Sequence, residues 1–63
     1  MNSKRAFELI DESDLDSCRT MLAISAPDLY EQLDTIIRSG ADPSVILSAA
    51  RDFVRQAYLR ERN

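Results

Sequence analysis

Apolar residues recur at helical spacing along most of this chain, and the pattern is clearest toward its end. One side of a helical wheel drawn for residues 43–60 carries a continuous apolar stripe, made of Ile46, Ala49, Ala50, Phe53 and Ala57, with Val54 on its flank. This spacing is that of an amphipathic helix whose apolar side packs on a core. We therefore predict a helix from Pro43 to about Arg60, with Phe53 as its one large core side chain.

A second helix is predicted directly before it, and Ser25 followed by Asp28 resembles a capping box at its start. Its inner face would carry Leu29, Leu33 and Ile36, flanked by Tyr30 and Ile37. Gly40, the only glycine, stands where a helix commonly ends on a residue with positive φ. Asp42 and Pro43 then supply an N-cap and a first helical residue for the next helix. Because the connection is so short, the two helices should pack as neighbours, in an αα-hairpin or a helix-turn-helix.

The chain ahead of residue 25 carries weaker helical patterns. Ser13 followed by Asp16 is typical of a helix start. The apolar face of the helix that follows would be formed by Leu15, Cys18 and Leu22, with Met21 beside them and Ile24 on the opposite face. Earlier still, residues 1–12 predict either a short helix with Phe7 and Ile10 turned inward or a loosely ordered segment.

The length of the chain limits how much core it can build. Sixty-three residues make one domain, and a core of this size rarely contributes more than ~3–5 kcal/mol to stability. The single cysteine, Cys18, excludes an internal disulfide, and there is no histidine to hold a zinc ion. We therefore expect one all-α domain over residues 1–63, with three or four short helices around the αα-hairpin and a core completed by homodimerisation.

Catalytic chemistry has little to build on in this sequence. Without histidine the usual general base is missing, no glycine-rich loop could hold a phosphate, and the chain is too small to enclose an ordinary ligand pocket. The acidic run at residues 8–16 lacks the glycine and the final glutamate of a calcium loop. Cys18 falls on the apolar face of its helix, where a thiol is usually inert. We expect a protein that is not an enzyme and that uses no cofactor and no metal ion.

Charge is unevenly distributed in this chain of net charge −3, with five acids in residues 8–16 and four arginines in residues 51–62. A narrow arc of the last helix, opposite the apolar stripe, carries Arg51, Arg55, Tyr58 and Arg62. In one interpretation these residues only complement the helix dipole and keep the helix soluble. In the other they bind a partner, since arginine and tyrosine are enriched at binding hot spots. The candidate partners are the acidic segment of a second copy, an acidic face of a larger protein, and nucleic acid.

Neither end of the chain carries a sorting signal, and no stretch approaches the ~20 apolar residues of a membrane span. A lone thiol fits a reducing compartment. The acidic balance argues against binding to anionic membranes and against non-specific binding to nucleic acid. We expect a cytoplasmic protein with no membrane partner.

The stretch "AISAPDLYEQLDTIIRSGADPSVILSAARDFVRQAYL" resembles the ribbon-helix-helix family of dimeric transcriptional repressors and antitoxins. The likeness covers Arg19 to about Leu59 and lies in the "LYEQLD" helix, the glycine turn and the "VILSAARDFV" helix. It implies that "RTMLAIS" forms a strand, with Leu22 and Ile24 inward, in place of a helix. The residues facing the DNA major groove would then be Arg19, Met21 and Ala23.

Two classes of function follow from these observations. We favour a non-enzymatic regulatory or inhibitory protein that acts by binding a larger protein, as small acidic proteins of phages and other mobile elements often do. The alternative is a dimeric DNA-binding repressor or antitoxin of the ribbon-helix-helix type. The structure of residues 14–25 separates the two, because the DNA-binding alternative needs Arg19 on an exposed strand.

Overall fold

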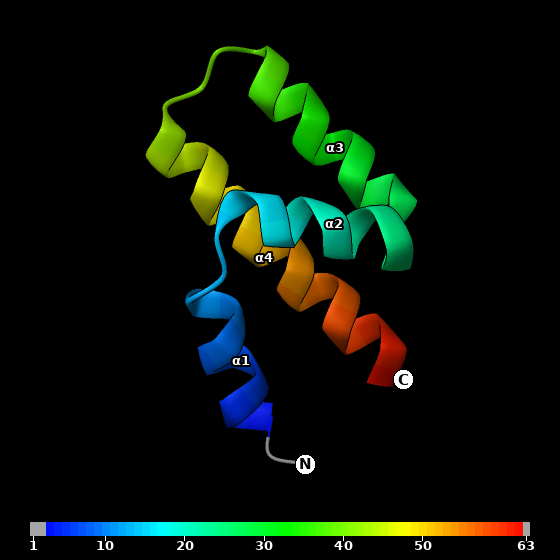
Figure 1. The fold of residues 1–63 in the computed structure, drawn as a ribbon. Helices are drawn as coiled ribbons and strands as arrows, with labels where there is room; N and C mark the ends of the chain where they lie inside the picture. The colour runs from blue at the N-terminus through cyan, green and yellow to red at the C-terminus, as the bar shows by residue number, and fades with distance from the viewer. Residues whose placement is uncertain (1–2, 63) are drawn as a thin grey trace.

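The computed structural model describes residues 3–62, and every regular element in that range is a helix. In chain order these are α1 (Ser3–Asp11), α2 (Leu15–Ser25), α3 (Pro27–Arg38) and α4 (Pro43–Arg62), as Figure 1 shows. The all-α prediction is therefore confirmed for the described residues. Of the two alternatives for the N-terminal segment, the short helix is the one that forms.

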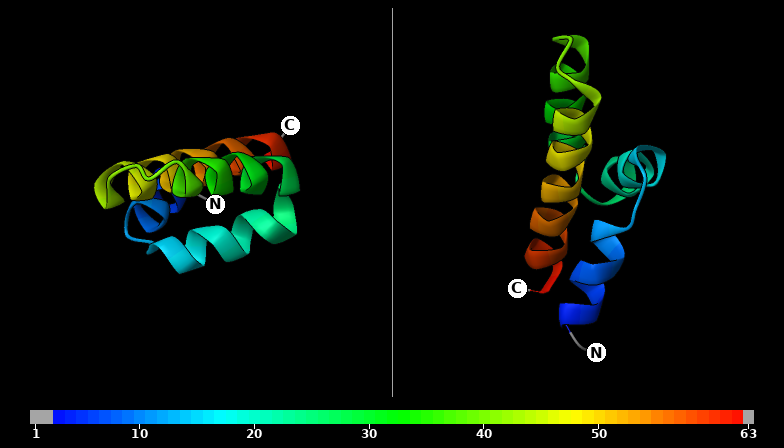
Figure 2. Two further views of the ribbon diagram at one scale, coloured as in Figure 1. Left: turned by 90° about the horizontal axis from the view of Figure 1, so that it is seen from above. Right: turned by 90° about the vertical axis from the view of Figure 1, so that its left-hand side faces the viewer.

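The longest helix, α4, has 20 residues and contacts each of the other three helices. α3 lies alongside it, α2 crosses one face of this pair, and α1 runs along the C-terminal half of α4 (Figure 2). α2, α3 and α4 all contact one another, whereas α1 packs chiefly against α4. The Cα radius of gyration is 11.3 Å, close to the roughly 11 Å expected for a folded chain of this length.

The turn between α3 and α4 forms as its glycine predicts. Gly40 has a φ of +81°, a backbone conformation that costs a residue with a Cβ about 1–2 kcal/mol. A Cβ at this position would meet no atom within 4 Å, so backbone conformation rather than space requires the glycine. Beyond it, α4 begins at Pro43, and the carbonyl of Asp42 accepts the Ile46 N–H at 3.0 Å.

Two helix starts differ from the prediction by one residue each. Asp14, rather than Ser13, caps α2: its carboxylate accepts the Ser17 N–H at 2.8 Å, and this bond lowers the pKa of the Asp14 carboxyl. Ser25 does not cap α3, because it is the last residue of α2 and only one residue separates the two helices. That residue is Ala26, which is buried and both closes α2 and opens α3, so no side chain caps the α3 N-terminus.

The core lies where α2 crosses α3 and α4. Its buried residues are Ile10, Cys18, Leu22, Ala26, Leu29, Leu33, Ala50, Val54 and Ala57. On α4 the buried face is rotated from the predicted one, because Val54 is buried whereas Phe53 and Ile46 are only half-buried. On α3, Ile37 rather than Ile36 packs against the core. Both shifts arise because each helix packs on more than one neighbour: α4 contacts three helices and α3 contacts two, and a single helical wheel does not contain such contacts.

Candidate functional site

Two of the predicted partner-binding residues, Arg51 and Tyr58, face α1 of the same chain. Arg51 Nε donates a hydrogen bond of 3.0 Å to the carbonyl oxygen of Ser13, just beyond the end of α1. The ring of Tyr58 meets the ring of Phe7 edge to face, with centroids 5.6 Å apart and planes at 70°. Arg51 and Tyr58 are half-buried. They therefore hold α1 on α4.

Arg55, a third member of the predicted surface, links α4 to the end of α1. Its guanidinium pairs with the carboxylates of Asp11 and Asp52, and the hydrogen bond it donates to Asp11 is the main cause of its raised pKa. The acidic segment that meets these arginines is thus the one in the same chain. Arg62, the fourth member, ends α4, and its side chain lies outside the described part of the structure. A partner-binding role for the four residues stays a prediction.

Other arginines are also engaged within the chain. Arg60 forms a bidentate pair with Asp28, with both N–O distances at 3.0 Å, and this pairing lowers the pKa of the Asp28 carboxyl. Two further ion pairs join Arg38 to Asp34 at 2.8 Å and Arg5 to Glu8 at 3.6 Å. The exposed carboxylates that form no ion pair with any described residue belong to Glu12, Asp14, Asp16, Glu31, Asp42 and Glu61. Among the described residues, these carboxylates outnumber the arginines that form no ion pair, Arg19 and Arg51, which bond to neutral oxygens.

Arg19, the DNA-contacting residue of the alternative interpretation, lies on α2. Its guanidinium donates to the Tyr30 hydroxyl at 3.4 Å, and its central carbon lies 5.9 Å from the centre of the Tyr30 ring. The strand that the ribbon-helix-helix resemblance implies over residues 19–25 is therefore wrong. A helix forms there because helical spacing buries Cys18 and Leu22 together, although it leaves Ile24 78% exposed.

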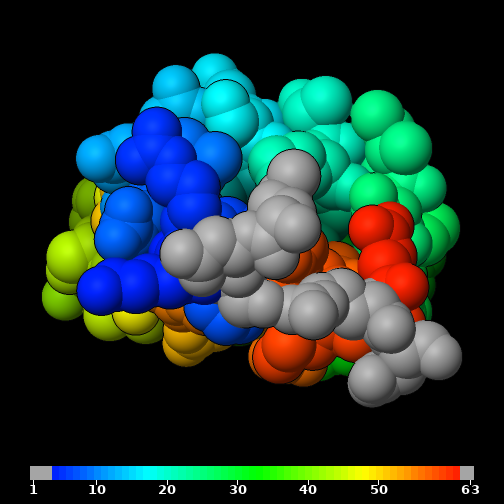
Figure 3. Space-filling model, turned by 90° about the horizontal axis from the view of Figure 1, so that it is seen from below, coloured from blue at the N-terminus to red at the C-terminus, as the bar shows by residue number. Residues whose placement is uncertain are grey.

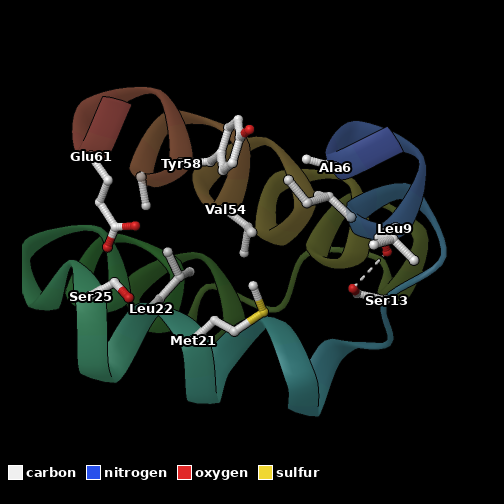
Figure 4. Close-up of a pocket in the computed structure, with 11 residues that line it drawn as sticks. Ala6, Leu9, Ser13, Met21, Leu22, Ser25, Val54, Tyr58 and Glu61 are labelled. Atoms are coloured by element: carbon white, nitrogen blue, oxygen red, sulfur yellow. Dashed lines mark hydrogen bonds between the residues drawn. The ribbon is translucent and has the colours of Figure 1, made fainter. Parts of the chain in front are cut away.

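A groove of about 310 Å³ runs between α1, α2 and α4. Its floor consists of buried apolar side chains, those of Ile10, Leu22, Val54 and Ala57. Leu22 of α2 and Val54 of α4 point toward each other across it (Figure 4). Its rims include Leu9 on α1, 51% exposed, and Met21 on α2, 42% exposed. Figure 3 shows parts of α1, α2 and the end of α4 on one face of the molecule.

The groove is suited to apolar contact. Among the described residues, Glu61 is the one charged side chain that lines it, and the Ser13 hydroxyl at its edge already donates to the Leu9 carbonyl at 3.0 Å (Figure 4). Cys18 does not line it: this thiol is buried in the core, and burial raises its pKa. Among residues 3–62, no group of three or more His, Cys, Asp or Glu side chains is placed to hold a metal ion.

Helical wheels do not predict this groove, because each of its walls comes from a different helix. A signal was nevertheless present in the sequence. Leu9 stands beside Ile10, and Met21 beside Leu22, so the apolar faces of α1 and α2 are wider than core packing uses. An apolar face that exceeds what the fold buries is what marks a contact surface.

Comparison with known proteins assigns no family to this chain. No protein-family model, curated protein or solved structure matches it. Within residues 3–62, no helix combines the length and apolar character needed to cross a membrane. The groove and the charges around it are therefore the basis on which a function can be proposed.

Proposed function

We propose that this protein is a non-enzymatic module that regulates or inhibits a larger protein by binding it through the groove between α1, α2 and α4. The observation that carries the proposal is the exposure of Leu9 and Met21 at the rims of an apolar groove. Contiguous apolar surface bordered by polar residues is typical of interaction sites. Covering it contributes roughly 25 cal/mol for each Å² of apolar surface removed from water.

The small core supports the same proposal. A chain of this length draws only ~3–5 kcal/mol from its own core, and the groove floor continues that core to the surface through Leu22 and Val54. A partner that fills the groove extends the core with its own apolar side chains. Binding also stabilises the folded chain by mass action, by about 2.7 kcal/mol at a partner concentration of 100 Kd.

Photo-crosslinking tests the proposal. A photoreactive amino acid replaces Met21 or, as a matched control, Gln32, which is exposed on α3 and does not line the groove. In cells that make the protein, we expect position 21 to form a covalent adduct with a larger protein and position 32 to form none. We also expect Leu9→Lys to abolish the adduct. Equal adducts from both positions, or no adduct from position 21, would contradict the proposal.

The homodimer expected from the sequence remains a prediction, as does the αα-hairpin of α3 and α4 as its foundation. Sedimentation equilibrium of the full chain decides whether a dimer forms. A dimer that persists in the Met21→Lys variant uses a face other than the groove and leaves the groove to the larger partner. A dimer that dissociates in this variant occupies the groove itself.

A further inference from the structure

The shape of the groove limits what can fill it. Its walls are three helices, and its floor, including Leu22 and Val54, lies between them. The rims at Leu9 and Met21 remain partly exposed, so the groove is open on one side and does not enclose a ligand. A helix laid on this floor would add a fourth member to the packing of α1, α2 and α4. Amphipathic helices dock in this way, through an apolar ridge at i, i+3, i+4 and i+7.

Four acidic residues line the groove, adjoin it or flank one of its lining residues in the sequence. Glu61 lines the groove, Glu12 and Asp14 flank the lining residue Ser13, and Asp16 lines an adjoining hollow of α2. We call Glu12, Asp14, Asp16 and Glu61 the acidic rim. The carboxylate of Asp14 caps α2, and the other three form no ion pair with any described residue. A partner therefore meets carboxylates that pair with no described cation, beside an apolar floor.

The nearby arginines whose side chains are described form no ion pair with the acidic rim. Arg51 and Arg55 contact the end of α1 and the residues beyond it, and Arg5 is paired with Glu8. A second copy docked groove to groove would place its own acidic rim opposite this one, in a chain whose net charge is already −3. Like charges placed opposite each other disfavour such a contact. The charge pattern selects a partner of opposite sign.

We infer that the groove binds a basic amphipathic helix of the partner protein. Its apolar face lies on Leu22 and Val54, and its lysines or arginines extend over Leu9 and Met21 toward the acidic rim. Long basic side chains suit both parts of this surface, because their aliphatic stems cover apolar rims while their charged ends stay in water. The inference rests on the proposed function, since it names the element of the partner that enters the groove.

Two synthetic peptides of about five helical turns provide the probe. Both carry leucine along one face, and they differ in having lysine or glutamate on the other. Titrated into the isotope-labelled full chain at low salt, the lysine peptide should bind at least about tenfold more tightly. Its largest NMR shift changes should lie around Leu9, Met21 and Glu61. Raising NaCl from about 0.05 to about 0.5 M should bring the affinities of the two peptides closer together, because salt screens exposed charges.

Matched charge variants test the role of the acidic rim. Glu12→Gln with Asp16→Asn removes two charges from the rim, whereas Glu31→Gln with Asp42→Asn removes two exposed charges that line no part of the groove. We expect the first pair to weaken lysine-peptide binding about tenfold and the second to change it by less than about threefold, because screening weakens distant charges. Equal losses in both would show that net charge, and not the rim, attracts the peptide, and would overturn the inference.

Matched apolar variants test the position of the helix. Met21→Lys changes the groove rim, and Val45→Lys makes the same kind of change at an α4 residue that is 52% exposed and outside the groove. We expect binding of the lysine peptide to be lost in the first variant and retained in the second. Retained binding in Met21→Lys would place the peptide elsewhere and overturn the inference.

Other outcomes distinguish this inference from the proposed function. Equal affinity for the two peptides would overturn the basic character of the partner helix and leave the groove as a protein-binding site. Failure of the lysine peptide to bind would also overturn the inference, while the crosslink from position 21 would decide separately on the proposed function. A dimer that Met21→Lys dissociates would show that a second copy fills the groove, against the inference.

Discussion

α1 and the body formed by α2, α3 and α4 are held together in different ways. In the body, Leu22, Leu29 and Leu33 are each no more than 2% exposed and share one apolar cluster. Among its described side chains α1 contributes one buried residue, Ile10, and it otherwise depends on contacts of Phe7 and Asp11 and of Ser13 just beyond its end. Burial of apolar volume fixes the body. α1 is held largely by half-exposed polar and aromatic contacts, which are individually weak.

This difference matters because α1 forms one wall of the groove. Proteins open locally where few apolar contacts are buried, so α1 should be the first element to separate from the rest. The proposed site is therefore bordered by the helix that we expect to open first. Four predictions test this comparison, from the largest expected effect to the smallest.

Leu22→Ala should break the body. Leu22 is 0% exposed, and removing a buried leucine side chain typically costs about 2–5 kcal/mol, because a cavity remains. This is comparable with the whole ~3–5 kcal/mol available to such a core. We expect urea titration followed by circular dichroism to show a largely unfolded variant. Ile24→Ala, at a residue 78% exposed on the same helix, should change stability by less than about 0.5 kcal/mol. Equal effects would show that the core assignment is wrong.

Phe7→Ala should loosen α1 without unfolding the body. The variant loses the edge-to-face contact with Tyr58 and a half-buried ring, for which we expect a cost of about 1–2 kcal/mol. Native-state hydrogen exchange should then accelerate in the amides of residues 3–11 and stay unchanged in the most protected amides of α2 and α4. Equal acceleration throughout the chain would mean that α1 and the body open as one unit.

Arg55→Gln should weaken the contact between α1 and α4 less than Phe7→Ala does. The side chains of Arg55 and Asp11 are 33% and 57% exposed, and exposed ion pairs typically contribute about 0.2–1 kcal/mol. We expect a loss in this range from thermal melts at low salt and a smaller loss at about 0.5 M NaCl. Arg38→Gln, which removes an ion pair within α3, should leave α1 exchange rates unchanged. Faster α1 exchange in that control would contradict a local role for Arg55.

Lowering the pH should produce the smallest loss of stability, and this loss should come from the body formed by α2, α3 and α4. The pKa values of the Asp14 and Asp28 carboxyls are lowered in the folded chain, by the Ser17 N–H and by Arg60 respectively. The unfolded chain therefore takes up protons first as the pH falls, so their stabilisation is complete above about pH 4 and is lost below it. Thermal melts from pH 7 to 2.5 should show this loss as a falling melting temperature. In Asp14→Asn the melting temperature should fall less steeply with pH. An unchanged slope in Asp14→Asn would contradict the capping contribution.

The connection between α3 and α4 could be predicted from the sequence because its chemistry is local. Gly40 supplies the positive φ, and Pro43 begins the next helix wherever the rest of the chain lies. The direction of the α4 core face could not be predicted in the same way. A wheel with one apolar side places Tyr58 in solvent, whereas in the folded chain Phe7 of α1 covers it. Side chains that meet a second packing partner belong to the tertiary structure.

The groove is harder still to predict from local sequence patterns, because it forms only where three helices meet. The exposed fractions of Leu9 and Met21 follow from where α1 and α2 stop approaching each other, and not from either helix alone. The absence of a strand at Arg19 was easier to foresee from the residues themselves. Asp14 caps a helix there, and Cys18 and Leu22 fall on one side of it.

The burial of Cys18 gives the protein a kinetic probe of its own. It is the only thiol in the chain and is 0% exposed, so an alkylating reagent reaches it only when α2 separates from its neighbours. The rate of alkylation under native conditions therefore measures how often the body opens, without any added label. A ligand that binds only the folded chain should slow this rate by the factor with which it stabilises the closed state. Thiol chemistry could thus detect a partner for this protein before the partner is identified.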